Sequence, residues 1–160
     1  MTRLTIVLLR ILLLFIAAGA LFAQVRLVPF IATGLTEDAG HPEAGVAYAV
    51  AGILSIGCGE VVLAALWVLL SHVRRGSIFT GSAFRWVDLI LWAGVVCTAV
   101  LLLLATHVAL VVEPPLDAPG LTVIAGALVV GALTFVLLMT VMRGLLRSAT
   151  AMQSELAEVV

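Results

Sequence analysis

The sequence has no lysine, and few of its residues carry a charge of either sign. Only 11% of the 160 residues are charged, whereas 64% are hydrophobic. A soluble domain has about 25% charged residues, and a chain of roughly 150 residues leaves about 30% of its unfolded surface exposed after folding. A soluble fold could not hide this much apolar surface. The composition therefore predicts an integral membrane protein with a single domain over residues 1–160.

The sequence also lacks the common signatures of chemistry. Its only two cysteines, Cys58 and Cys97, have no CxxC spacing and no histidine at ligand spacing, which indicates neither a disulfide scaffold nor a zinc site. No serine or threonine stands with a base, and the glycine fingerprints for phosphates and dinucleotides are absent. We therefore expect no enzymatic activity, no catalytic or metal-binding residues and no cofactor. The net charge of −1 gives no indication of nucleic-acid binding, and we expect no direct nucleic-acid partner.

Four apolar runs are long enough to cross a membrane, because about 20 helical residues span about 30 Å of hydrocarbon. They cover about residues 4–25, 46–70, 83–112 and 121–142. Since the connections are short, we predict an all-α integral membrane protein whose four transmembrane helices form an antiparallel bundle.

The first run has an alternative interpretation as a cleaved signal peptide. Arg3 would be its charged n-region and Ala18-Gly19-Ala20 its cleavage site. The length of the run and the presence of Arg10 within it favour a membrane span. After this run, the apolar front half of residues 26–45 is expected to lie against the membrane surface, and the acidic residues 36–43 to form a solvated loop.

The arginines are distributed unevenly among the loops. Arginine and lysine in short loops favour the cytoplasmic side, whereas acids contribute little. With both termini inside, the outer face of the membrane carries only Arg26. The inner face then carries Arg3, Arg74, Arg75, Arg85, Arg143 and Arg147. We therefore predict a multi-pass protein of the cell membrane with both termini cytoplasmic.

The fourth run does not end at the membrane. No glycine or proline interrupts residues 145–160, and apolar residues recur there at steps of three and four with polar residues between them. The sequence therefore predicts that span four continues into a cytoplasmic amphipathic helix over residues 143–160.

Small residues mark the second span. Ala51, Ser55 and Gly59 lie four residues apart on one helical face, which lets another helix backbone approach closely. A tight contact within the chain is favoured over a dedicated dimer motif, and a homo-oligomer is compatible with the sequence.

Cys58 and Cys97 fall at similar depth on antiparallel helices. They could form a redox pair, but the favoured interpretation is that both are small apolar side chains that fill space between packed helices.

Three ionisable residues within spans are candidate functional residues, because burying such groups in a membrane is costly. Glu60 lies near the bilayer midplane, where two roles are open to it. It is either part of an ion or proton site, or a protonated carboxyl that forms a hydrogen bond with a neighbouring helix. Arg10 and Asp88 each lie about 9 Å inside the cytoplasmic ends of spans one and three. We predict a salt bridge between them. The alternatives are snorkelling by Arg10 and helix capping by Asp88.

The polar break at the middle of the chain carries the one recognisable motif. It contains Gly76-Ser77-Ile78-Phe79-Thr80, followed by the small or polar residues Gly81-Ser82-Ala83 and by Phe84-Arg85 near the start of the third span. This stretch resembles the Gly-x-x-Phe-Thr cytoplasmic hairpin of DUF2975, a family of small four-span bacterial membrane proteins of unknown function. The tail at residues 146–158 is similar to the family's Ala-x-x-Leu-x-x-Glu ending, except that Met152 replaces leucine. The resemblance implies a four-span fold, a membrane location and no established activity. It also implies a regulatory setting, because members are often encoded beside small helix-turn-helix regulators.

The hairpin and the tail together lead to a functional hypothesis. The hairpin offers candidate docking residues for a protein partner or an anionic membrane lipid, although an ordinary anchored turn is the simpler alternative. These candidates are Arg74, Arg75, Phe79, Thr80 and Arg85. The hypothesis is a non-enzymatic accessory or regulatory protein with a cytoplasmic or membrane protein partner. The alternative is an oligomeric channel or transporter for a small ion or solute that uses Glu60.

Overall fold

The structure is a computed structural model that describes residues 3–74 and 81–158, and all secondary structure in this part of the chain is helical. In this part, four helical stretches are long and apolar enough to cross a membrane. They are Val7–Asp38, Pro42–Ser71, Arg85–Leu116 and Pro119–Thr150. The predicted all-α fold with four apolar spans is therefore confirmed.

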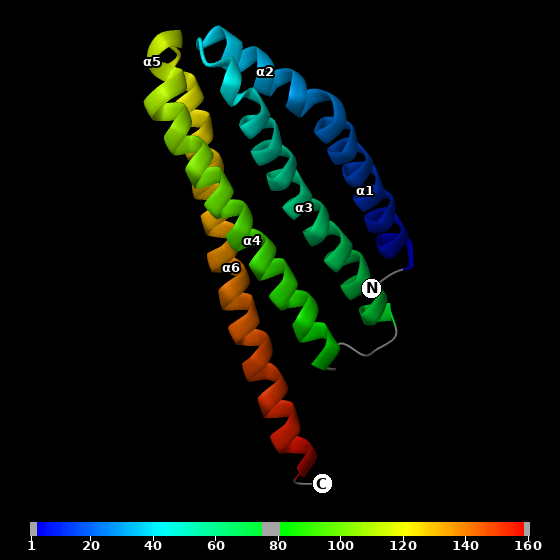
Figure 1. Ribbon diagram of the computed structural model, residues 1–160. Helices are drawn as coiled ribbons and strands as arrows, with labels where there is room; N and C mark the ends of the chain where they lie inside the picture. The colour runs from blue at the N-terminus through cyan, green and yellow to red at the C-terminus, as the bar shows by residue number, and fades with distance from the viewer. Residues whose placement is uncertain (1–2, 75–80, 159–160) are drawn as a thin grey trace.

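Six α-helices and three short helical segments follow one another along the described chain. In order they are α1 (Arg3–Phe22), a π-helical segment (Ala23–Leu27), α2 (Val28–Asp38), a 3-10 turn (Pro42–Ala44), α3 (Gly45–Arg74), α4 (Gly81–His107), a second π-helical segment (Val108–Val112), α5 (Glu113–Leu116) and α6 (Pro119–Glu158). Figure 1 shows that α1 begins and α6 ends on the same side of the molecule, which we call the termini end. The opposite side, with α5 and the turn between α2 and α3, is the far end.

The first membrane helix is longer than predicted. We expected a surface segment after about Val25, but α1, the π-helical segment and α2 continue as helix to Asp38. Pro29 lies in the first turn of α2, and the wide π turn before it accommodates a residue that has no backbone donor. The Val28 N–H accordingly donates to the Ala23 carbonyl, five residues back. Figure 1 shows the resulting curved path, which brings α2 over α3.

A glycine ends this long helix. Gly40 has a φ of +79°, a conformation that side chains disfavour. The Gly40 N–H donates to the Glu37 carbonyl at 3.0 Å, and the His41 N–H donates to the Thr36 carbonyl at 2.8 Å. These two bonds are the pattern of a Schellman ending, which satisfies the last carbonyls of a helix. The predicted acidic loop is therefore a tight turn into α3.

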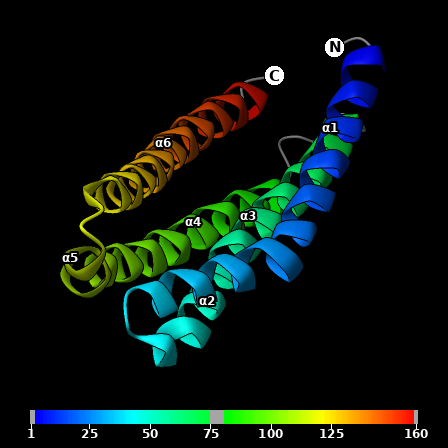
Figure 2. The same cartoon turned by 90° about the horizontal axis from the view of Figure 1, so that it is seen from above.

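The membrane helices stand in an open row, in which each packs on the next one along the chain. The α1–α2 helix lies on α3, α3 lies on α4, and α4 lies on α6. Figure 2 shows α1 and α6 on opposite flanks of the molecule, with α3 and α4 between them. Successive membrane helices run in opposite directions. Because α3 stands between α1 and α4, this order decides which charged residues can meet.

A cluster of enclosed side chains lies at the far end, where α2, α3 and the second π-helical segment meet. Its buried members are Ala32, Ala39, Tyr48, Val108 and Val112. Elsewhere large apolar side chains point outward along the membrane helices, and Phe15 and Phe30 are 78% and 77% exposed. An apolar surface of this extent indicates contact with lipid or with other membrane helices.

Glycines permit close approaches between the long helices at two places. A Cβ on Gly52 of α3 would lie 2.7 Å from Val28 Cγ1 of α2, and a Cβ on Gly94 of α4 would lie 3.0 Å from Val136 Cγ2 of α6. Close backbone approach through small residues is how membrane helices associate when water does not drive their packing.

The small-residue face predicted on α3 turns partly towards α4. The Cys97 thiol donates to the Ser55 carbonyl at 3.8 Å, whereas a Cβ on Gly59 would meet nothing within 4 Å. Cys58 and Cys97 are free thiols that line the same apolar cavity of about 220 Å³. The two cysteines therefore lie at one depth, as predicted, and their surroundings fit small apolar fillers.

Candidate functional site

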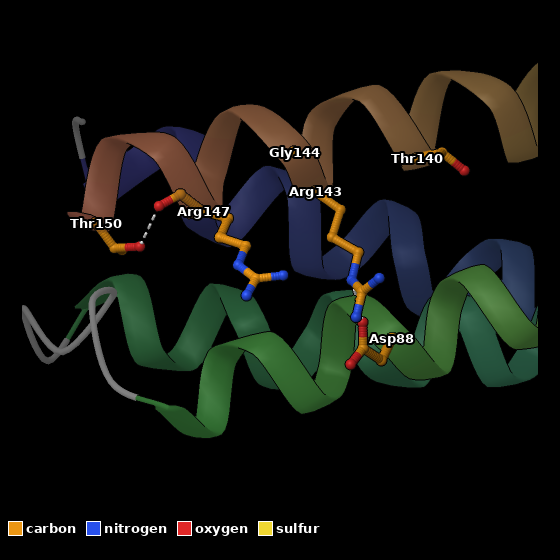
Figure 3. Close-up of a pocket in the computed structure, with 6 residues that line it drawn as sticks. All are labelled: Asp88, Thr140, Arg143, Gly144, Arg147 and Thr150. Carbon is orange, nitrogen blue, oxygen red and sulfur yellow. Dashed lines mark hydrogen bonds and ion pairs between the residues drawn. The ribbon is translucent and has the colours of Figure 1, made fainter. Parts of the chain in front are cut away.

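An ion pair joins α4 to α6 towards the termini end. The Arg143 Nε donates to Asp88 Oδ1 at 2.6 Å, and the two side chains are 49% and 39% exposed. Figure 3 shows Arg143 reaching from α6 to Asp88 on α4. A charge-assisted hydrogen bond of this length is among the stronger polar contacts available to a protein. It fastens the start of the α6 extension to the membrane part of the molecule.

The predicted salt bridge between Arg10 and Asp88 was wrong. Arg10 instead donates from Nη2 to Ser71 Oγ of α3 at 3.1 Å, and its guanidinium lies 5.0 Å from the centroid of the Trp67 ring. The prediction was based on the depths of Arg10 and Asp88 along their helices. It did not consider which helices lie next to one another. Because α1 lies on α3, Arg10 fastens α1 to α3 and does not reach α4.

Arg143 is the ion-pair partner that sequence reasoning missed. We counted it only as one of the charges that set the membrane orientation. A signal was nevertheless present, because consecutive elements are usually neighbours in space. Arg143 directly follows the fourth predicted span, and Asp88 lies near the start of the third, so antiparallel packing of these two spans brings them together.

The ion pair forms one wall of a polar groove between α4 and α6. The groove has a volume of about 440 Å³, and Thr140, Gly144, Arg147 and Thr150 complete its lining. Figure 3 shows the Arg147 side chain extending from α6 towards α4. Both threonine hydroxyls donate to carbonyls within α6. In the part of the chain that the structure describes, the Arg147 guanidinium has no hydrogen-bond or ion-pair partner.

Glu60 lies at the centre of the 30-residue helix α3, about 22 Å from either end. Gln24 Nε2 donates to Glu60 Oε2 at 3.3 Å and to the Ile53 carbonyl at 3.3 Å. The other carboxyl oxygen, Oε1, is enclosed and has no hydrogen-bond partner among the described residues. Glu60 therefore faces the first membrane helix of its own chain and keeps one bonding position unused.

Gln24 is the second site residue that sequence reasoning missed. It lies in the π-helical segment between α1 and α2, and such segments occur frequently at functional sites. The available signal was an amide side chain inside an otherwise apolar span, since a buried amide needs hydrogen-bond partners.

A further polar contact joins α3 to α4 at the far end. The Tyr48 hydroxyl and His107 Nδ1 form a hydrogen bond at 2.6 Å, and their rings meet edge to face with centroids 5.5 Å apart. Tyr48 is buried in the far-end cluster, so this contact is part of the packing there. Among the described residues, no three histidine, cysteine or acidic side chains gather closely enough to hold a metal ion.

The candidate docking residues of the hairpin fall mostly outside the described part of the chain. Arg75, Phe79 and Thr80 lie outside the described residues, and Arg74 is the last residue of α3. Arg85 is exposed near the start of α4, at the termini end. The docking role of these residues stays a prediction.

Four helical stretches long and apolar enough to cross a membrane, with charged contacts near the termini end and a carboxyl in the middle of α3, indicate a multi-pass membrane protein. The family model described as "Protein of unknown function (DUF2975)" matches residues 5–160, so the chain belongs to this family, as its hairpin and tail motifs predicted. No curated protein and no solved structure matches the chain.

Proposed function

We propose that this protein is a non-enzymatic accessory or regulatory protein of the bacterial inner membrane that binds a protein partner at its termini end. The observation that carries the proposal is α6, a single helix of 40 residues from Pro119 to Glu158. At 1.5 Å per residue it is about 60 Å long, twice the roughly 30 Å of a hydrocarbon core. Beyond the ion pair, α6 runs about 22 Å from Arg143, whereas α4 extends only about 10 Å from Asp88. Figure 1 shows α6 projecting past the other helices.

The part of α6 from Arg143 to Glu158, which we call its projecting part, has one anchored face and one free apolar face. Arg143 and Arg147 extend towards α4, as Figure 3 shows. Leu145 and Met152, two turns apart, lie on the other side of the helix and are both 61% exposed. A projecting amphipathic helix with a free apolar stripe is suited to binding in the groove of a partner. The ion pair between Asp88 and Arg143 supports this role because it limits the directions in which the helix can point.

The proposal places both termini in the cytoplasm, and the distribution of charge supports this orientation. Arg85, Arg143 and Arg147 lie towards the termini end, whereas acidic residues gather at the far end. Arginine in short loops favours the cytoplasmic side. Reporter fusions test the orientation. Green fluorescent protein after residue 160 should fluoresce, and alkaline phosphatase inserted after Gly40 should be active; the reverse pattern would contradict the orientation.

Affinity purification from membranes tests the partner. We would compare the wild type with a truncation that lacks residues 144–160, with Met152→Glu, and with Ser154→Glu as the matched control. Position 154 lies about 200° around the helix from Met152, so the control adds the same charge away from the apolar stripe. The wild type and Ser154→Glu should retain the same partner, and the truncation and Met152→Glu should lose it. Partners that are unaffected by the truncation, or the absence of any partner, would contradict the proposal.

A second candidate function is an oligomeric channel or transporter for a small ion or solute. The observation that favours it is the enclosed, unpartnered Oε1 of Glu60, because ionisable groups at mid-membrane frequently belong to ion or proton pathways. Since the helices of one chain form an open row, a pore would require several copies of the chain. Flux into liposomes should be measurable for the wild type and reduced by Glu60→Gln. Background flux for both proteins would refute this function.

A further inference from the structure

The groove between α4 and α6 carries an excess of positive charge. Two guanidinium groups, those of Arg143 and Arg147, share it with one carboxylate, that of Asp88. A guanidinium has five N–H donors, and Arg143 uses its Nε–H on Asp88. The remaining donors of Arg143 can bind an anion without breaking the ion pair. Arg147 contributes a second, unpaired guanidinium one turn away, and a tetrahedral anion between the two would receive donors from both.

The groove lies at the depth of lipid headgroups. Residues 89–112 and 119–142 contain no aspartate, glutamate, lysine or arginine, and Asp88 and Arg143 are the charged residues that bound these two runs at the termini end. Each run has 24 residues, about 36 Å of helix, which is enough to cross a hydrocarbon core of about 30 Å. The volume of about 440 Å³ is within the usual range for a ligand site. An anion held here would therefore be at the boundary between hydrocarbon and water.

An apolar strip continues from the groove towards the membrane centre. On α4, Val95 lies seven residues beyond Asp88, so it shares the same helix face. On α6, Leu137 precedes Gly144 and Leu133 precedes Thr140 by the same interval. These three apolar side chains are exposed, at 37%, 59% and 48%. A ligand whose anionic head binds the arginines can therefore lay an apolar chain along this strip.

We propose that the α4–α6 groove binds the phosphate headgroup of an anionic phospholipid from the leaflet at the termini end. The two arginines would bind the phosphate, and the acyl chains would lie against Val95, Leu133 and Leu137. A free phosphate ion could bind the arginines but would leave the apolar strip uncovered. An acidic peptide lying on the strip would bring the polar groups of its backbone into the hydrocarbon, which is costly. The combination of both features therefore favours a lipid.

Native mass spectrometry of the full-length protein in detergent tests this site. The probes are dioleoyl phosphatidylglycerol and dioleoyl phosphatidylcholine, which differ in headgroup charge but have the same acyl chains, and inorganic phosphate as competitor. The wild type should bind phosphatidylglycerol more tightly. Arg147→Gln should weaken this binding about tenfold, the loss expected for a charge-assisted hydrogen bond, and should leave phosphatidylcholine binding unchanged.

Two further variants separate the groove from general charge. Gly144→Leu fills the groove without changing its charge, and a Cβ at Gly144 meets nothing within 4 Å, so the helix accepts the side chain. It should weaken phosphatidylglycerol binding as Arg147→Gln does. Arg26→Gln removes an exposed arginine outside the groove and should have no effect.

Three results would overturn the lipid site: equal affinity of the wild type for both lipids, equal losses for Arg26→Gln and Arg147→Gln, or displacement of phosphatidylglycerol by an equimolar amount of inorganic phosphate. Lipid binding and partner binding can fail separately, because Arg147→Gln changes the groove while Met152→Glu changes the opposite face of α6.

Discussion

The Asp88–Arg143 ion pair should stabilise the packing of α6 on α4 by an amount that a double-mutant cycle can measure. Fully exposed pairs contribute about 0.2–1 kcal/mol. Here the side chains of Asp88 and Arg143 are 39% and 49% exposed, and the donor–acceptor distance is 2.6 Å. Because the pair is partly enclosed among apolar side chains, solvent screens the attraction between the two charges less than at an open surface. Since desolvation offsets part of the Coulomb attraction, we expect a coupling free energy of about 1–2 kcal/mol.

The cycle consists of Asp88→Asn, Arg143→Gln and the double variant, with unfolding in micelles followed by circular dichroism as the denaturing detergent is increased. Each single variant should lower the free energy of unfolding, and the double variant should lose less than the sum of the two. Asp88→Asn combined with Arg10→Gln is the matched control, and those two changes should be additive. A coupling below about 0.3 kcal/mol for Asp88 and Arg143, or a larger one for Asp88 and Arg10, would refute the observed pairing.

Three other changes test the packing and can be measured by thermal unfolding in detergent. Gly52→Leu should destabilise the protein by about 1–3 kcal/mol because its side chain would overlap Val28, and Val28→Ala should restore part of the loss; an unchanged melting temperature for Gly52→Leu would contradict the close approach of α2 and α3. Gln24→Leu should lower the free energy of unfolding by about 1–3 kcal/mol because both carboxyl oxygens of Glu60 then lack a hydrogen-bond partner. Adding Glu60→Leu should recover most of this loss, and a double variant without recovery would contradict the contact between Gln24 and Glu60. Gly40→Ala should lower the free energy of unfolding by about 1–2 kcal/mol because alanine is strained at a φ of +79°. A variant as stable as the wild type would contradict the Schellman ending of α2.

The number and position of the membrane helices could be predicted because they follow from local composition. A run of apolar residues of sufficient length forms a helix in a membrane wherever it packs. The continuity of α6 was predictable for the same reason, since no glycine or proline interrupts its outer part. Pro29 led to the largest error in helix length. A proline usually ends a helix, but the π-helical turn before it let the helix continue to Asp38.

The polar contacts could be predicted less well because they depend on lateral order. The depth of a residue follows from its distance to the end of a span, and the predicted pairing of Arg10 with Asp88 rested on depth alone. Which helices are neighbours is decided by close contacts such as that of Gly94 with Val136, which composition does not reveal. The pairing of Glu60 with Gln24 likewise depends on the π-helical segment, which turns the amide towards α3.

The central claim is that the projecting part of α6 is the surface through which the protein acts, and photo-crosslinking in living cells tests it most directly. A photoreactive amino acid would replace Met152 on the apolar stripe or Ser154 on the other side of the helix. We predict one protein adduct from position 152, none from position 154, and a weaker adduct from position 152 when Asp88→Asn removes the ion pair. Equal adducts from both positions, or none from position 152, would contradict the claim.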